Sequence, residues 1–165
     1  MGTAIDFIPE KVVDLVDFDI QVLFMANLIK LKSLKEPSEE SDGFRILIAR
    51  YRPRYLPKYK ENWDEWWKDL APSRTLWKDY LKDKKIDWPV YVGRFILEIR
   101  NNIEAVNALR TLASTAYMEG EKRQQQYGKY HLDKENQTVT LLCHCIEEKY
   151  CHRSIVKGMI QEFKE

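Results

Sequence analysis

The sequence lacks several features that would assign it to a large class of proteins. It has no run of eighteen apolar residues, so no transmembrane helix is predicted. No basic start followed by a long apolar stretch is present, so no signal peptide is expected. Its 27 basic and 26 acidic residues nearly cancel, so overall charge predicts neither a membrane nor a nucleic-acid partner.

Cysteine is also scarce, with only three residues in the chain. They lie within nine positions of one another, which cannot build a disulfide framework. An odd, clustered set favours a reducing environment, and we therefore expect a cytoplasmic protein. What is present, 44% hydrophobic and 32% charged residues over 165 positions, is typical of one folded domain, 1–165.

Short apolar runs alternate with stretches of helical periodicity. The runs predict strands at 20–25, 44–49 and 138–143. We expect a helical turn at 26–34 and helices at 63–70, 73–82, from 87 onward, at 102–117 and at 152–163. Residues 1–18 are interpreted as an N-terminal extension and the polar segment 119–137 as a surface insertion. The pattern predicts an α/β fold, with a small, mostly parallel, Rossmann-like sheet and helices packed on both faces.

The stretch TVTLLCHCIEEKYCHRS, at 138–154, holds all the cysteines and raises the question of chemistry. A phosphatase-type loop needs an arginine six positions after its cysteine. Arg153 instead follows Cys143 by ten positions, Cys145 by eight and Cys151 by two. The spacing therefore excludes that loop.

Two other chemistries remain for this stretch. Cys151, at the start of the last helix, is the candidate nucleophile, with His152 as its catalytic neighbour. Cys143, Cys145, Cys151 and His152 also form an alternative zinc-ligand set. The usual knuckle spacing of two residues between cysteines is absent, so no metal is favoured and no cofactor is expected, with zinc as the alternative. The plainer interpretation is two buried cysteines and a helix start.

Ligands of parallel α/β sheets bind beyond the carboxyl ends of the strands. The second and third predicted strands end at Arg50 and Cys143, so we expect these ends to meet at one mouth. Guanidinium, imidazole and helix amide groups there suit a phosphate or carboxylate. The predicted ligand-binding residues are Arg50, Tyr51, Arg52, Cys143, His152 and Arg153. In the alternative interpretation, Arg50 and Arg153 pair with acids such as Asp69 and Glu98, or with carbonyls, and close the loop.

A basic stretch with interleaved tyrosines, RILIARYRPRYLPKYK, covers 45–60 and contains no acid. Such alternation fits a phosphate backbone with stacked bases. The candidate nucleic-acid contacts are Arg52, Arg54, Lys58 and Lys60. The alternative is a solvated loop whose tyrosines pack on the tryptophans at 63, 66 and 67.

Several of these elements together resemble domain of unknown function family 488. The resemblance rests on IARY followed by a proline (48–53), LAPS (70–73), and a cysteine separated by seven residues from CHR (143–153). It spans about 22–160 and implies an α/β domain without an established activity. The chain departs from the family pattern at Leu23, where a Ser or Thr is common, and at Cys145, where an acid is common.

These patterns lead to one main functional hypothesis and two alternatives. The main hypothesis is a strand-end pocket for an anionic ligand that contains phosphate or carboxylate, such as a nucleotide or nucleic acid. The first alternative is a non-enzymatic module, stabilised by zinc or built on the basic loop, that binds nucleic acid. The second is an interaction protein with a reduced structural cysteine cluster.

Overall fold

The computed structural model describes residues 28–117, 127–132 and 138–163. The N-terminal extension and the strand predicted at 20–25 lie outside the described residues. Of the segment 119–137, only 127–132 is described. There Tyr130 and Leu132 are buried, and both join the main hydrophobic core.

A parallel sheet forms the centre of the molecule, as the sequence predicts. Its four strands run in the order β1-β4-β2-β3, and all pairs are parallel. The strands are β1 (Ile29–Ser33), β2 (Phe44–Leu47), β3 (Glu65–Trp66) and β4 (Val139–Cys143). The strands predicted at 44–49 and 138–143 are therefore confirmed, and they are direct neighbours.

Two segments expected to be helical belong to the sheet instead. β1 lies in the predicted helical turn 26–34, and its sequence IKLKS alternates apolar and basic residues with the period of a strand. The predicted helix 63–70 is replaced by β3 and a 3₁₀-helix, Lys68–Leu70. The amide of Trp67 donates to the Leu47 carbonyl at 2.9 Å, and that of Asp64 donates to the Arg45 carbonyl at 2.8 Å. Pairing with β2 thus uses the amides that a helix would need.

The remaining helices form where the sequence predicts them. They are α2 (Arg74–Trp77), which continues as a π-helix (Lys78–Lys82), α3 (Trp88–Arg100), α4 (Ile103–Tyr117) and α5 (His152–Ile160), followed by a 3₁₀-helix (Gln161–Phe163). Ser73 caps α2 by accepting the Leu76 amide at 3.1 Å, and Asp87 caps α3 by accepting the Val90 amide at 3.1 Å. No helix among the described residues is long and apolar enough to cross a membrane.

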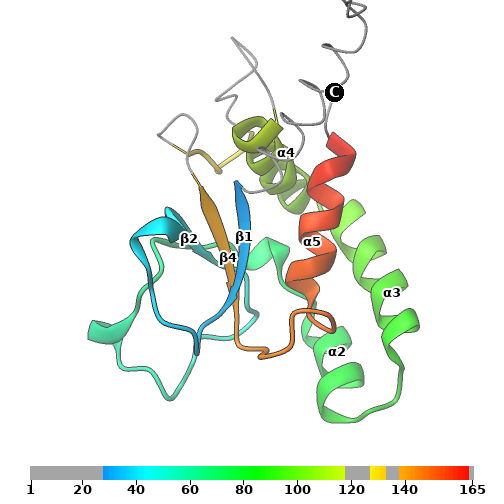
Figure 1. Ribbon diagram of the computed structural model, residues 1–165. Helices are drawn as coiled ribbons and strands as arrows, with labels where there is room; N and C mark the ends of the chain where they lie inside the picture. Colours follow the sequence, from blue (N-terminus) through cyan, green and yellow to red (C-terminus); the bar gives the residue numbers. More distant parts are fainter. Residues whose placement is uncertain (1–27, 118–126, 133–137, 164–165) are drawn as a thin grey trace, which may run out of the picture.

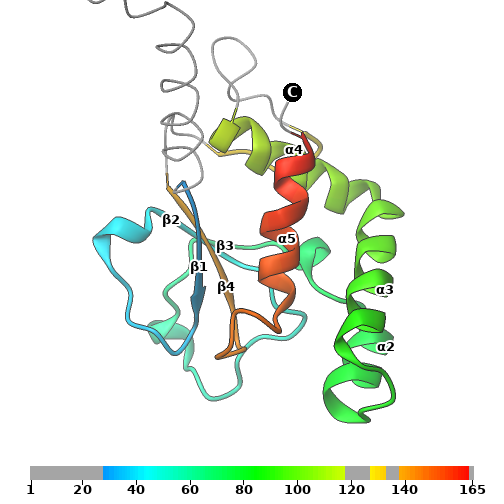
Figure 2. The same ribbon diagram turned by 45° about the vertical axis from the view of Figure 1, so that its right-hand side comes forward.

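The helices α3, α4 and α5 lie together on one side of the sheet (Figures 1 and 2). Their apolar faces meet Ile29, Ile46, Ile48, Val139 and Leu141 in the main core. In the described part of the chain, loops and a short 3₁₀-helix, Glu40–Asp42, cover the opposite side. A second, smaller cluster there joins Leu34, Leu47, Ala49 and Leu142 to the half-buried rings of Trp63 and Trp66.

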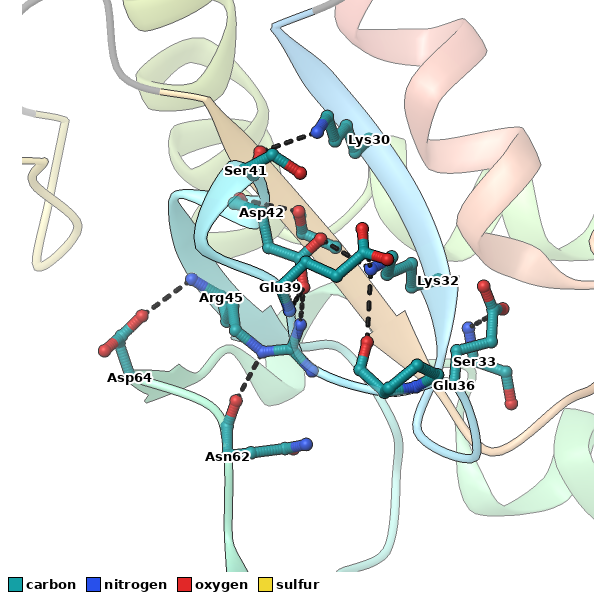
Figure 3. A network of polar contacts seen from close by, with 12 residues as sticks. Lys30, Lys32, Ser33, Glu36, Glu39, Ser41, Asp42, Arg45, Asn62 and Asp64 are labelled. Carbon is teal, nitrogen blue, oxygen red and sulfur yellow. Dashed lines mark hydrogen bonds and ion pairs between the residues drawn. The ribbon is translucent and has the colours of Figure 1, made fainter.

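A buried ion network completes this second side (Figure 3). The carboxylate of Asp42, in the 3₁₀-helix Glu40–Asp42, is fully buried and pairs with Lys32 at 2.7 Å and with Arg45. Lys32 also pairs with Glu39 at 3.1 Å, and the Thr140 hydroxyl donates to the Asp42 carbonyl at 2.7 Å. The network therefore ties β1, β2 and β4 to the segment that connects β1 to β2.

Candidate functional site

A cavity of about 400 Å³ opens at the carboxyl ends of β2 and β4. It lies where parallel α/β sheets bind ligands. Five aromatic side chains form much of its wall, namely Tyr51, Trp77, Tyr80, Tyr91 and Tyr150. Its polar lining consists of Arg50, Cys143, His144, Cys145, Cys151 and His152.

The three cysteines come together in the lining of this cavity. Their Sγ atoms all lie within 4.8 Å of one another, and those of Cys143 and Cys145 are 3.8 Å apart. Cys143 and Cys151 are buried, Cys145 is half-buried, and all three are free thiols. Cys143 is the last residue of β4, and Cys151 immediately precedes α5. The strand end and the helix start therefore supply one compact group of sulfur atoms.

The three thiols differ in their tendency to ionise. Interactions with the thiols of Cys145 and Cys151, helped by the charge of Arg153, hold the pKa of Cys143 well below its usual value. The same interactions with Cys143 raise the pKa of Cys145 and of Cys151. The pKa of Cys151, the nucleophile predicted from its place before α5, is thus raised by its sulfur neighbours.

The His152 ring is oriented by the backbone carbonyl of Ile48, the residue that follows β2. Its Nε2 lies 2.6 Å from the Ile48 carbonyl oxygen, which can only accept, so Nε2 carries the proton. Nδ1 then presents a lone pair to the sulfurs of Cys143 and Cys151, at 3.9 and 3.8 Å. Burial lowers the pKa of His152 and keeps the imidazole neutral.

The two arginines predicted to share an anion have different environments. Arg153 is 1% exposed and donates to the carbonyls of Lys32 and Cys145, at 3.0 and 2.9 Å, and of Ile146, at 3.2 Å. It clamps the loop after β4 and does not line the cavity. This geometry matches the carbonyl-paired alternative.

Arg50 does line the cavity. Its guanidinium donates from Nε to the Pro72 carbonyl at 2.6 Å and from Nη2 to the Ala71 carbonyl at 3.2 Å. Within residues 28–117, 127–132 and 138–163 it has no carboxylate partner. The acids considered for it are engaged elsewhere, because Asp69 pairs with Lys129 and Glu98 binds Ser73. The positive charge of Arg50 therefore faces the cavity with only carbonyl dipoles beside it.

The cavity continues outward into basic hollows. One, of about 600 Å³, shares Tyr51, Trp77 and His144 with the cavity and adds Arg52, Arg54 and Arg74. Another, of about 360 Å³, is lined by Arg74, Lys78 and Lys82. Sequence reasoning missed these last three residues, although their spacing of four puts them on one face of the predicted helix 73–82. We call Arg54, Arg74, Lys78 and Lys82 the basic rim.

The other residues of the basic stretch lie around this rim. Arg52 forms an ion pair with Glu61, and Lys58 lines a separate hollow with Arg52 and Arg54. The Lys60 ammonium is 5.9 Å from the centre of the Tyr59 ring, which is 83% exposed. Of the four candidate nucleic-acid residues, Arg52 and Arg54 thus adjoin the cavity, and Lys58 and Lys60 lie farther along the loop.

Comparison with known proteins assigns the chain to a family. The model of the DUF488-N3a family, described as the active DUF488-N3 subclade, matches residues 29–120 and 113–164. The chain belongs to the DUF488-N3a family. The uncharacterised protein YeaO of Escherichia coli (strain K12) is 31% identical over 85 residues, which cover 52% of this chain and 73% of YeaO. No solved structure matches. The resemblance seen in the sequence is therefore confirmed, and this DUF488-N3a protein has the expected α/β fold.

Proposed function

We propose that this DUF488-N3a protein binds a nucleotide unit, with the base in the aromatic cavity and the phosphates on the basic rim. One observation carries the proposal: a cavity with an aromatic wall adjoins a hollow lined by arginines, and the two share Tyr51, Trp77 and His144. A nucleotide has the same division, with a flat, largely apolar base at one end and a multiply charged group at the other.

The dimensions and chemistry of the cavity support a base. Its volume of about 400 Å³ falls within the usual range of small-molecule pockets, about 300–1,000 Å³. Tyr51 and Trp77 stand at its outer end with their ring centres 5.3 Å apart, and both rings also line the larger basic hollow. Each base stacked on an aromatic ring contributes about 1–3 kcal/mol to binding. Arg50 supplies donors for base or sugar oxygens at the same edge.

The basic rim supports the phosphates. Arg54 and Arg74 line the same hollow, and their planar guanidiniums can bind phosphate oxygens in pairs. Lys78 and Lys82 extend this positive surface along one side of the π-helix that follows α2. The shared chemistry covers both a free nucleotide and the end of a single-stranded nucleic acid.

The test is fluorescence titration and thermal shift with AMP, ADP, adenosine, inorganic phosphate and a short 5′-phosphorylated single strand. We expect ADP to bind at least about tenfold more tightly than adenosine or phosphate, because only ADP occupies both parts of the site. If the single-stranded nucleic acid binds more tightly than ADP and its affinity falls steeply at high salt, the ligand is a nucleic acid and not a free nucleotide. No response to any of these at millimolar concentration overturns the proposal.

A pair of double variants locates the binding site. Arg54→Gln with Arg74→Gln removes two rim charges, and we expect at least about tenfold weaker ADP binding. Arg100→Gln with Lys157→Gln removes the same charge from α3 and α5, away from the cavity, and should bind ADP normally. Equal weakening in both double variants would mean that only net charge is recognised.

A further inference from the structure

We propose that Cys143, Cys145, Cys151 and His152 bind one zinc ion in the lining of the cavity. The site is independent of the nucleotide proposal, since it rests on the cysteines, on His152 and on the charge of Arg153. Sulfur and imidazole nitrogen are the ligands that zinc prefers, and four of them in a tetrahedron make a closed site. The ligands come from the end of β4, the loop after it and the start of α5.

The separations of the donor atoms already approach those of a zinc site. Zn–S bonds of about 2.3 Å in a tetrahedron put two sulfurs about 3.8 Å apart, and a Zn–N bond of about 2.0–2.1 Å puts sulfur and nitrogen about 3.5 Å apart. Cys143 and Cys145 sulfurs are 3.8 Å apart, and all three sulfurs fit within 4.8 Å. His152 Nδ1 lies 3.9 and 3.8 Å from the sulfurs of Cys143 and Cys151. The Cys143–Cys145 pair therefore needs no change, the two sulfur–nitrogen pairs must shorten by about 0.3–0.4 Å, and no sulfur pair must shorten by more than about 1 Å.

His152 has the second contact that metal-binding histidines usually make. Such residues donate the other ring N–H to a carbonyl or carboxylate, which fixes the ring and leaves the metal-binding nitrogen unprotonated. Here Nε2 donates to the Ile48 carbonyl at 2.6 Å, while Nδ1 points at the sulfurs. The imidazole packs edge-on against Phe95, with ring centres 5.6 Å apart, so the ring has little freedom to turn away.

The charges around the cluster also match. Zinc with three thiolates and a neutral imidazole carries one net negative charge. Arg153 is buried and has only carbonyl partners among the described residues, including that of Cys145 at 2.9 Å. A buried guanidinium without a carboxylate partner is costly. The anionic zinc centre would supply this missing partner and would lock the loop that carries His144 and Tyr150, two walls of the cavity.

The test uses the full chain, reduced and stripped of metal with a chelator, and titrates it with Co²⁺ and then Zn²⁺ without any nucleotide. We expect one Co²⁺ per chain, with thiolate charge-transfer absorption and the visible bands of tetrahedral cobalt, both erased by one equivalent of Zn²⁺. Retained zinc is then counted by elemental analysis after desalting. A colourless titration, or zinc well below one per chain, overturns the proposal.

Matched variants assign the ligands. Cys145→Ser, at the most accessible of the three thiols, should weaken Zn²⁺ binding at least 100-fold and shift the charge-transfer band, and His152→Gln should weaken it at least tenfold. His144→Ala, whose ring instead contacts the Tyr51 carbonyl at 2.8 Å, should keep full zinc content. Loss of zinc in His144→Ala as large as in Cys145→Ser would contradict the assignment. If Cys145→Ser does not fold, the wild-type cobalt spectrum still decides the question.

The two proposals can fail separately. Zinc binding is measured without nucleotide, and nucleotide binding is measured on both the metal-free and the zinc-loaded protein. Zinc without ADP binding retains the metal centre and rejects the nucleotide site. ADP binding by a protein that binds no zinc retains the nucleotide site and rejects the metal centre.

Discussion

The Nε2 atom of His152 donates a hydrogen bond to the carbonyl of Ile48 across 2.6 Å, which joins the first turn of α5 to the residue after β2. The two residues are 104 positions apart, and both are buried. This one bond fixes the helix start against the strand end, and thereby fixes the cysteines beside it.

Replacing His152 by Phe keeps a ring of similar size but leaves the buried Ile48 carbonyl unpaired. We expect the free energy of unfolding to fall by about 1–3 kcal/mol. Urea denaturation with a chelator present measures this cost without any contribution from metal. His144→Phe is the control, because this half-buried ring also contacts a carbonyl, that of Tyr51 at 2.8 Å, but at an exposed position where water can replace it, so the change should stay within about 0.5 kcal/mol. Equal losses would mean that the Ile48 bond adds nothing.

Arg153 is a structural clamp rather than a surface charge. Arg153→Lys keeps the charge. The single ammonium nitrogen of lysine cannot reach the three carbonyls to which the two guanidinium nitrogens of Arg153 donate. We expect a loss of about 3 kcal/mol in unfolding free energy, measured by urea denaturation. Arg100→Lys, in an exposed pair with Glu162, should change it by at most about 0.5 kcal/mol. A fully stable Arg153→Lys protein would show that the clamp is dispensable.

The sequence predicts the elements whose pattern is local. The mainly apolar run of β4 and the helical spacing in α3 and α4 are visible without tertiary information. The spacing of Trp63, Trp66 and Trp67 predicts a helix. The backbone amides of this segment instead bond to carbonyls of β2, a strand that lies elsewhere in the sequence, so the segment joins the sheet. The strand β1 was missed although its alternation of apolar and basic residues was present.

The candidate site divides in the same way. Strand-end reasoning anticipated that Arg50, Tyr51, Cys143 and His152 would lie near one another, and all four line the cavity. It did not separate Arg50 from Arg153, since the partners of Arg153 are the carbonyl of Lys32, 121 positions away, and those of Cys145 and Ile146 in the loop before α5. The aromatic wall was also missed. In the sequence, Tyr80 and Tyr91 are ordinary residues of predicted helices. Only the fold brings these helices to the edge of the sheet, where both side chains line the cavity.

The buried carboxylate of Asp42 holds two cations in place (Figure 3). Asp42→Asn removes the negative charge and leaves Lys32 and Arg45 without their main partner, which we expect to cost about 3–5 kcal/mol of unfolding free energy. Glu39→Gln is the matched control, because its carboxylate pairs with the same lysine but is 58% exposed, and it should cost at most about 1 kcal/mol. Equal effects, measured by urea denaturation, would contradict the special role of the buried group.

The same carboxylate makes stability depend on pH. Burial by itself would raise the pKa of Asp42, but hydrogen bonds from Lys32 and the Glu39 backbone, with the charge of Arg45, lower it below the ordinary value of 3.8. The folded protein then holds fewer protons than the unfolded chain as pH falls below about 4, so the unfolding free energy decreases with acidification. This contribution is complete above the unfolded value and is lost as pH drops through the folded one. We therefore expect the stability difference between wild type and Asp42→Asn, measured by urea denaturation, to be constant from pH 5 to 7 and to shrink below about pH 4. A difference that stays constant down to pH 2 would show that Asp42 is not the titrating group.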